Sequence, residues 1–326
     1  MSNNPLVSVI VINYNGSKYL KRCLESLYAG AYRNMEIIFM DNGSIDSSLD
    51  LVRSNFGQVK IIENKENLGL SVASNRGASL AKGEYLLFYN NDTVADKDMI
   101  LNLVKRCETD KDIGICGCRT MTYDGKQIIN EGVSCDIFGY PFNGRKFFYV
   151  DAAIFIKRSV FDQLGGFDEQ MFLYGEDRDL CWRAWLYGHK VAVERSAFFL
   201  HDSFCVTEDI KDYRSTVKKR YLGEFNAIRS ICKNYSFAFI LWILPLFLII
   251  NLAEMILFSL ILRFDIVWGV YIKAHMQNLK EWPSSALLRK KVQKGRRITD
   301  GQLIKHMHAG SGKLNLFFKW GVPKFQ

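Results

Sequence analysis

Polar side chains that could bind a ligand end several apolar runs in the first hundred residues. The runs lie at 7–12, 35–40 and 85–89, and amide, phenol or carboxylate groups follow each of them directly. These groups belong to Asn13, Tyr14, Asn15, Asp41, Asn90, Asn91 and Asp92. Carboxylate and amide oxygens are the ligands that hard divalent cations prefer. The pattern therefore indicates a polar site at the ends of buried elements.

A purely structural explanation of such residues is that Asn, Asp and Ser make turns and cap helices. This explanation is sufficient for Asn42, Ser44 and Asn64, which stand in polar turns. It is less convincing for Asp92, because this residue ends an almost wholly apolar run.

A second acidic group, Glu176, Asp177 and Asp179, opens a stretch with helical character. Two neighbouring carboxylates repel each other, which can raise the pKa of one toward the range that a general base needs. The structural alternative is that acids simply favour the positive end of a helix. Asp179 and Arg183, four residues apart, fit that alternative better, as an ordinary helix ion pair.

The elements that must position these residues alternate along the chain. Apolar runs at 7–12, 35–41, 59–64 and 85–92 predict strands buried on both faces, and a helical pattern is predicted at 71–83. Strands that alternate with helices indicate βαβ units and a mostly parallel sheet, which binds ligands at the carboxyl ends of its strands.

The composition excludes several classes of protein. With 326 residues, 48% of them hydrophobic, the chain can bury a large core and is not a disordered protein. Its eight cysteines form no CxxC pair, which argues against a zinc site or a disulfide scaffold and favours a reducing cytosol. The N-terminus does not resemble a signal peptide. P-loop, GxGxxG, GxSxG and HExxH motifs are absent.

The positive charge is concentrated in the last third of the chain. Residues 205–326 hold 20 Lys and Arg against 8 Asp and Glu, beside an apolar run at 237–262 whose single charge is Glu254. We expect a membrane surface as partner rather than nucleic acid. A single span would place the basic residues that follow it on the outer side, against the positive-inside rule. A hairpin or interfacial helices are therefore favoured, with a buried helical pair or a dimer interface as the alternative.

Residues 5–204 resemble the inverting family 2 glycosyltransferases, which have the GT-A fold. The resemblance is carried, in the family's order, by VSVIVINYNG, IIFMDNGSIDSS, NLGLSVASNRGASLAKGEYLLFYNND, GGFDEQMFLYGEDRDLCWRAWLYG and then His201. It implies an α/β GT-A catalytic domain at 1–204, a basic helical connector at 205–236, and an apolar hairpin or interfacial helices with a basic tail at 237–326. Within the family, the chain looks most like the rhamnosyltransferases of bacterial surface polysaccharides.

The resemblance also assigns roles to residues of this chain. The nucleotide would be bound by Asn13, Tyr14, Asn15, Asp41, Asn67, Gly69, Arg76, Asn90 and Asn91. Asp41 would accept a hydrogen bond from the imide N–H of the base, which favours a UDP- or dTDP-sugar over a GDP-sugar. Arg76 has a fork geometry suited to phosphate, and a surface helix cation is the equal alternative.

The family's metal motif reads Asn90-Asn91-Asp92 here, with one carboxylate where the family has two. Asp92 and His201 are the expected ligands of a divalent cation, Mn²⁺ or Mg²⁺. Asp177 is the expected general base, and Glu176 would orient the base or the acceptor. The predicted acceptor is a hydroxyl of a glycan or a lipid-linked molecule at the cytoplasmic face of the bacterial inner membrane. The alternatives are a sugar-nucleotide nucleotidyltransferase and a non-catalytic glycan- or nucleotide-binding module.

Overall fold

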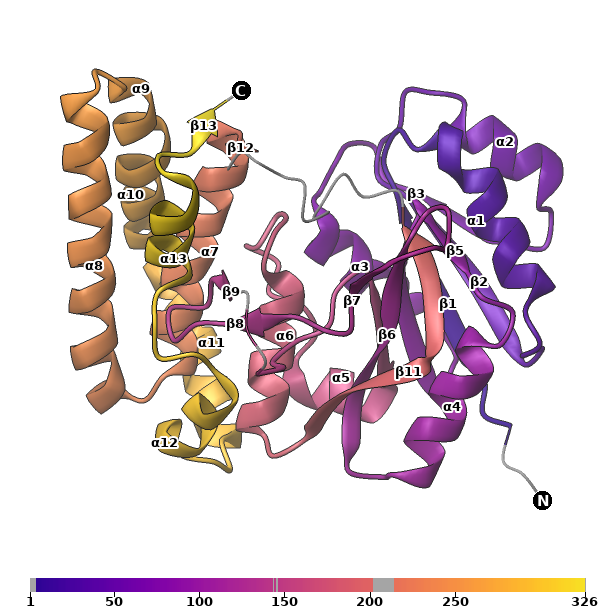
Figure 1. Ribbon diagram of the computed structural model, residues 1–326. Helices are drawn as coiled ribbons and strands as arrows, with labels where there is room; N and C mark the ends of the chain where they lie inside the picture. Colours follow the sequence, from indigo (N-terminus) through magenta and orange to yellow (C-terminus); the bar gives the residue numbers. More distant parts are fainter. Residues whose placement is uncertain (1–3, 143, 145, 202–213, 326) are drawn as a thin grey trace. The chain divides into compact units, whose positions relative to one another are not determined.

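The computed structural model describes residues 4–142, 144, 146–201 and 214–325, which form two compact units (Figure 1). Within the described residues, unit 1 consists of 4–132, 149–172 and 189–201, and unit 2 of the remainder. Both units are thus assembled from separate stretches of chain, and residues 173–188 belong to unit 2. The domain division predicted from the sequence stays a prediction, and its boundary at 204 lies outside the described residues, as do positions 205–213 of the predicted connector.

Unit 1 is built on a nine-stranded sheet with the order β3-β2-β1-β4-β10-β6-β11-β5, in which β7 also pairs with β6. Its strands are β1 (Val7–Asn13), β2 (Met35–Asp41), β3 (Lys60–Glu63), β4 (Tyr85–Asn90), β5 (Thr93–Ala95), β6 (Ile113–Thr122), β7 (Ile128–Asn130), β10 (Ala153–Lys157) and β11 (Lys190–His201). Its helices are α1 (Ser17–Ala29), α2 (Ser48–Asn55), α3 (Leu70–Leu80), α4 (Met99–Thr109) and α5 (Arg158–Leu164).

The first four strands confirm the predicted βαβ arrangement. β1 pairs in parallel with both β2 and β4, and β2 pairs in parallel with β3. In the other half of the sheet β6 and β11 are also parallel, but β10 is antiparallel to β4 and β6, and β5 is antiparallel to β11, so the sheet is less parallel than expected. The described residues between β6 and β10 form no helix, and a parallel pairing of the two strands would need a crossover connection. The sheet is therefore mixed.

Helices cover both faces of this sheet. On one face, apolar residues of α1, α2 and α4 pack against Val7, Val9 and Val11 of β1 in a single core cluster. On the other face α3 lies so close that a Cβ on Gly77 would be 2.5 Å from the Ile10 side chain. Glycine is required there by the close approach of helix and strand. The polar residues after the central strands are thus held by a scaffold with helices on both faces of the sheet.

Unit 2 is mainly helical and carries the basic part of the chain. Its helices are α6 (Glu176–Leu186), α7 (Val217–Asn234), α8 (Phe237–Leu260), α9 (Phe264–Ile266), the π-helix η1 (Val267–Ile272), α10 (Lys273–Lys280), α11 (Trp282–Gly295), α12 (Asp300–Leu303), the 3₁₀-helix η2 (Ile304–His306) and α13 (Gly312–Trp320). Its short strands are β8 (Ser134–Cys135), β9 (Pro141–Phe142), β12 (Arg214–Ser215) and β13 (Lys324–Phe325).

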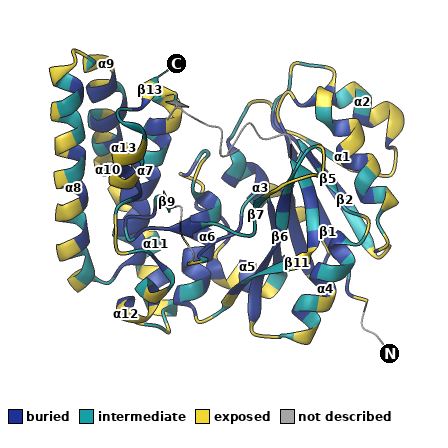
Figure 2. Cartoon of the chain, viewed as in Figure 1, coloured by how far each residue is buried: buried dark blue, intermediate teal, exposed yellow. Residues whose placement is uncertain are grey.

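The apolar run predicted in the sequence forms the single helix α8, which continues through Pro245. By length and composition α8 is long and apolar enough to cross a membrane, and only 17% of its most apolar window is buried. Figure 2 shows the mixture of exposed and buried residues along this helix. The apolar run therefore forms one continuous helix with few buried residues on this chain.

Candidate active site

The carboxyl ends of the central strands meet at one edge of the sheet in unit 1, as the topology predicts. The register places Asn13 of β1 beside Asp41 of β2, and Ile12 beside Asn90 of β4. Asn13, Asp41 and Asn90 therefore share this edge. The other predicted site residues of unit 1 lie in the loops beyond it or at the end of β11, except Arg76, which lies within α3.

Asn13 is the centre of the first polar cluster at this edge. Its Nδ2 donates to Asp41 Oδ1 and to Ser44 Oγ, each at 3.0 Å, and its Oδ1 accepts from Asn91 Nδ2 at 2.6 Å. Asp41 Oδ2 accepts from the backbone N–H of Ser44 at 2.9 Å. Asn13 and Asp41 are both buried. Each Asp41 oxygen thus has one protein donor and retains capacity for a second hydrogen bond.

The loop after Asn13 presents an aromatic ring and uses a strained residue to do so. Tyr14 is exposed. The next residue, Asn15, has a positive φ of 52°, a backbone region that Asn tolerates better than most residues. The Asn15 backbone N–H donates to Ser44 Oγ at 2.9 Å, and Asn15 Oδ1 accepts from the Ile45 N–H at 2.8 Å. Asn15 therefore shapes the loop, and the Tyr14 ring is the part free to meet a ligand.

Asn42 organises the second polar cluster, a role that the sequence did not reveal beyond a turn residue. Its Nδ2 donates to Asn67 Oδ1 at 3.0 Å and to the Gly69 carbonyl at 3.2 Å, and its Oδ1 accepts from Asn64 Nδ2 at 3.1 Å. Arg76 Nη1 donates to Asn64 Oδ1 at 2.7 Å. The predicted residues Asn67, Gly69 and Arg76 are thus brought together through two asparagines that the sequence assigned to turns.

Gly69 could not be replaced by another residue without rearrangement. Its φ is +82°, and a Cβ there would lie 2.6 Å from the carbonyl oxygen of Phe172. This conformation starts α3 directly after the asparagine cluster. The predicted importance of Gly69 therefore has a structural basis that does not require contact with a ligand.

Asp92 and His201 form the third group, as predicted. Asp92 stands between β4 and β5, and the antiparallel pairing of β5 with β11 places Thr93 opposite His201. The Asp92 Oδ1 to His201 Nε2 distance is 3.2 Å, with 31% and 16% of the two side chains exposed. Asn90, in contrast, contributes its backbone carbonyl, which accepts from Thr93 Oγ1 at 2.5 Å.

This pair fits a divalent cation as a partial ligand set. One carboxylate and one imidazole lie within the spacing that a shared ion requires. Among the residues that the structure describes, no group of three or more His, Cys, Asp or Glu side chains could enclose an ion. A cation held by Asp92 and His201 would therefore keep open positions for water or for substrate oxygens, as catalytic sites do.

Asp151 is a candidate site residue that the sequence analysis missed. It precedes β10, and Ala153 of that strand lies opposite Tyr89 of β4, so Asp151 stands at the same edge as the strand ends. Burial raises the pKa of Asp151, and the nearby His201 opposes this rise. Ala152, which directly follows Asp151, has a φ of 57°, and its carbonyl accepts from the Asn90 N–H at 3.2 Å. A strained backbone at this position is typical of functional sites.

The predicted acid pair Glu176 and Asp177 belongs to unit 2, where it opens α6. Burial, reinforced by the neighbouring Asp177 carboxylate, raises the pKa of Glu176 to about 8. Glu176 is buried and Asp177 is partly exposed. Asp177 Oδ1 accepts from the Arg178 backbone N–H at 2.6 Å. At neutral pH the buried acid is therefore mostly protonated, which leaves Asp177 as the carboxylate suited to accept a proton.

The helix that carries this pair is fixed by a buried ion network. Asp179 Oδ2 lies 2.9 Å from both Arg183 Nε and Lys233 Nζ, and its Oδ1 accepts from Asn234 Nδ2 at 2.9 Å. The predicted pair of Asp179 and Arg183 is confirmed, but it is buried rather than on a surface. This network ties α6 to α7 and so fixes the backbone from which Asp177 projects.

Residues 8–165 match the family model described as Glycosyl transferase family 2. Among curated relatives, the chain is 36% identical over 114 residues to "Glycosyltransferase GlyG" of Streptococcus pneumoniae, an alignment that covers 34% of this chain and 38% of the relative. It is 33% identical over 115 residues to "Putative glycosyltransferase EpsH" of Bacillus subtilis, covering 34% and 33%. The chain thus spans about a third of the length of the curated relatives it matches.

Solved structures extend the likeness in fold beyond that segment. The S. aureus TarS 1–349 structure in complex with UDP has a TM-score of 0.53 at 16% identity, covering 70% of this chain and 66% of that one. The mannosyltransferase PcManGT from Pyrobaculum calidifontis, in complex with GDP-Man and Mn²⁺, has a TM-score of 0.55 at 16% identity, covering 90% and 86%. The GT-A-like α/β fold with a mixed sheet is therefore shown.

Proposed function

We propose, from the premise that residues 8–165 are a glycosyl transferase family 2 domain, that the protein is an inverting, metal-dependent glycosyltransferase. The donor would be a UDP- or dTDP-sugar, with rhamnose as the transferred sugar, and the acceptor a hydroxyl of a glycan or a lipid-linked molecule. The observation that carries the proposal is the Asp92–His201 pair, at 3.2 Å, beside the Asn13–Asp41 cluster. The setting proposed is the cytoplasmic face of the bacterial inner membrane, in the synthesis of cell-surface polysaccharide.

The nucleotide would be bound by the polar clusters at the strand ends. The exposed Tyr14 ring can stack on a base. An Asp41 oxygen, which has one protein donor already, can accept a second hydrogen bond from the imide N–H of uracil or thymine. The Asn42 cluster holds the loop at Asn67 and, through Asn64, the Arg76 guanidinium. In this proposal Arg76 exchanges part of that contact for a phosphate oxygen.

Asp92 and His201 would hold Mn²⁺ or Mg²⁺ at the donor diphosphate. The bound ion would stabilise the negative charge that grows on the diphosphate as the glycosidic bond breaks. The mannosyltransferase PcManGT and GalNAc-T7 were both solved with Mn²⁺, which supports a divalent cation in proteins of this fold. His201 offers an imidazole ligand, and this chemistry favours Mn²⁺ over Mg²⁺.

Asp177 would act as the general base. It would take the proton of the acceptor hydroxyl while the hydroxyl oxygen bonds to the anomeric carbon and the nucleoside diphosphate leaves from the opposite side, which inverts the configuration. Glu176, protonated at neutral pH because burial raises its pKa, would donate a hydrogen bond and orient the acceptor. This division of roles follows from the different burial of two adjacent carboxyl groups.

The experiment is incubation of the protein with UDP- and dTDP-sugars, including dTDP-rhamnose, in Mn²⁺ with and without chelator. We expect slow release of the nucleoside diphosphate that requires the cation, and faster release once an acceptor glycan is supplied, with an inverted anomeric configuration in the product. Release of pyrophosphate from a sugar phosphate and a nucleoside triphosphate would identify a nucleotidyltransferase instead. Tight nucleotide binding without turnover of any donor would identify a binding module.

A further inference from the structure

The polar and apolar faces of α8 are reversed relative to a helix on the surface of a soluble protein. Its buried stripe contains Ile243, Phe247 and Phe258, together with the helix's single asparagine, Asn251. Its single charged residue, Glu254, faces the same side and is mostly buried. The exposed side chains along the helix are all apolar: Phe237, Ala238, Leu241, Trp242, Pro245, Leu246, Leu248, Ile249, Leu252, Ala253, Ile256 and Leu260. A helix of a soluble protein shows the opposite pattern.

Buried ion pairs hold the inner face of α8 against unit 2. Lys313 Nζ of α13 lies 2.6 Å from Asn251 Oδ1, 2.7 Å from Glu254 Oε2 and 2.6 Å from Glu224 Oε1 of α7. Arg220 of α7 also pairs with Glu254. Because an unpaired charge in this interior would be costly, these contacts prevent α8 from rotating its polar residues outward. The buried ion pairs therefore keep the apolar face of α8 on the outside of unit 2.

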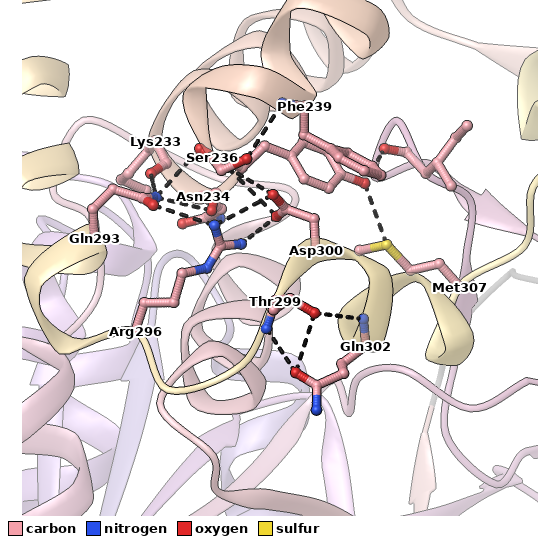
Figure 3. A network of polar contacts seen from close by, with 12 residues as sticks. Lys233, Asn234, Ser236, Phe239, Gln293, Arg296, Thr299, Asp300, Gln302 and Met307 are labelled. Atoms are coloured by element: carbon pink, nitrogen blue, oxygen red, sulfur yellow. Dashed lines mark hydrogen bonds and ion pairs between the residues drawn. The ribbon is translucent and has the colours of Figure 1, made fainter.

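The start of α8 is fixed as firmly as its middle (Figure 3). Ser236 caps the helix by accepting from the Phe239 N–H at 3.3 Å, and its own N–H donates to Asp300 Oδ2 at 3.1 Å. Arg296 pairs with Asp300. The helix thus has one defined orientation on the helices beneath it, which a loosely attached segment would not have.

Exposed apolar side chains continue beyond the end of α8. Leu262 is 76% exposed and has a positive φ of 59°, at a position after the helix where Gly or Asn is usual. The Leu262 and Arg263 N–H groups close the helix on Ser259 and Phe258. Phe264 and Trp268 follow, both exposed. A leucine in this conformation adds an exposed apolar side chain at a position where glycine would add none.

The helices around α8 determine how it could meet a bilayer. α8 packs against α7 and η1, and Figure 1 shows it along one side of the helices of unit 2. Other helices of unit 2 expose charges: Lys218 and Lys219 in the first turn of α7, Lys273 and Lys280 at the two ends of α10, and Lys290 and Lys291 of α11. Lipid around the whole group would bury these charges at high cost. The outer face of α8, whose exposed side chains are all apolar, is compatible with hydrocarbon.

We propose that α8 lies in the plane of an anionic bilayer surface, with its apolar face among the acyl chains, and that it does not cross the bilayer. At 24 residues, or about 36 Å, it offers one continuous contact. A bilayer is favoured as the occupant because residues 205–326 hold 20 Lys and Arg against 8 Asp and Glu, which complements anionic headgroups. The proposal rests on α8 and its neighbours alone and would stand if the chain transferred no sugar.

The experiment is flotation of the full-length protein with vesicles of phosphatidylcholine, with and without phosphatidylglycerol. We expect binding that is stronger with the anionic lipid and that falls at least about tenfold in the variant Leu241→Gln/Ile249→Gln. Both side chains are exposed, so the variant should fold, which its melting temperature checks. Ile128→Gln, an exposed apolar residue of β7, is the matched control and should bind like the parent chain.

A second experiment tests whether α8 lies in the plane of the bilayer surface or crosses the bilayer. An environment-sensitive nitrobenzoxadiazole label is placed at Ala238→Cys or at Leu260→Cys, near the two ends of α8, with the unsubstituted chain as background. Dithionite added outside the vesicles should bleach both labels to the same extent. Protection of one end would overturn the in-plane proposal in favour of a span. Equal flotation of the glutamine variant, no binding of the parent chain, or a dimer that this variant dissolves would overturn the bilayer as the occupant.

Discussion

The strand-end edge of unit 1 and the interior of unit 2 are both rich in polar side chains, but they use them differently. At the edge, Asp92 and His201 are partly exposed and share one long contact. In the interior, Asp179 and Lys313 are buried, and each lies close to several partners. A buried polar side chain with several protein partners indicates a structural role. A partly exposed polar side chain with few protein contacts can still bind a ligand and indicates a functional role. Glu176 and Asp177 are a third case, because Glu176 is buried with one carboxyl oxygen, Oε2, that has no hydrogen-bond partner among the described residues, and the adjacent Asp177 is partly exposed.

The largest effect should come from replacing the proposed base, Asp177. This substitution should change the rate of the reaction without changing the stability of unit 2. Asp177→Asn should lower turnover by about 10²–10⁴-fold, the contribution typical of a positioned general base, while donor binding and the melting temperature stay near those of the parent chain. Steady-state release of nucleoside diphosphate, with calorimetry of donor binding, measures both. Substantial residual transfer would remove Asp177 from this role.

The next largest effect should fall on stability. Asp179→Ala removes the carboxylate that lies 2.9 Å from both Lys233 Nζ and Arg183 Nε, so we expect the free energy of unfolding to fall by about 3–5 kcal/mol. Urea unfolding followed by circular dichroism measures the loss. Adding Lys233→Met should restore part of it, and the double variant serves as the control. If Asp179→Ala has the same stability as the parent chain, the buried ion network of unit 2 does not have the structural role assigned to it.

A pH dependence should distinguish Glu176 from the fully paired acids. Its pKa in the folded protein is raised to about 8, so the folded state keeps a proton that the unfolded chain releases near its ordinary pKa of 4.5. The stability linked to this group is complete below pH 4.5 and is lost as pH rises toward 8, by at most about 1.4 kcal/mol per pH unit. Unfolding curves of Glu176→Gln, compared with the parent chain across this range, should lack that slope. Parallel curves would contradict the raised pKa.

The smallest effect tests a local feature outside both regions. Thr299 begins α12 with a capping box, in which its side chain accepts from the Gln302 N–H at 3.2 Å and Gln302 Oε1 accepts from the Thr299 N–H at 2.8 Å. Thr299→Ala should cost about 1 kcal/mol of stability and leave nucleotide release unchanged. Thr299→Ser retains the cap and is the control, and a loss as large as that of Asp179→Ala would contradict this assignment.

Much of unit 1 was predictable because its first half obeys one rule. Continuous apolar runs gave β1, β2 and β4 within two residues of their observed ends, and parallel pairing then placed Asn13, Asp41 and Asp92 at one edge. Asp151 was missed because this inference assumed parallel strands. Only the antiparallel orientation of β10 brings the residue before a strand to the edge where other strands end.

The remaining differences between the sequence-based interpretation and the structure concern contacts between residues far apart in the sequence. Asn42 reads as a turn residue until its contacts with Asn64 and Asn67 are known. Asp179 reads as half of a helix pair until Lys233, from another helix, supplies the second cation. Glu254 reads as an interruption of an apolar run, but Lys313 and Arg220 draw it inward and the helix continues. No local pattern specifies contacts over such separations.

The central claim is that Asp92 and His201 bind a divalent cation together with a nucleoside diphosphate. Calorimetric titration of UDP and dTDP into the parent chain and into Asp92→Ala, with Mn²⁺ and with chelator, tests it most directly. We predict that Mn²⁺ tightens nucleotide binding to the parent chain at least about tenfold and leaves binding to Asp92→Ala unchanged. Equal tightening in the two proteins, or none in either, would contradict the account.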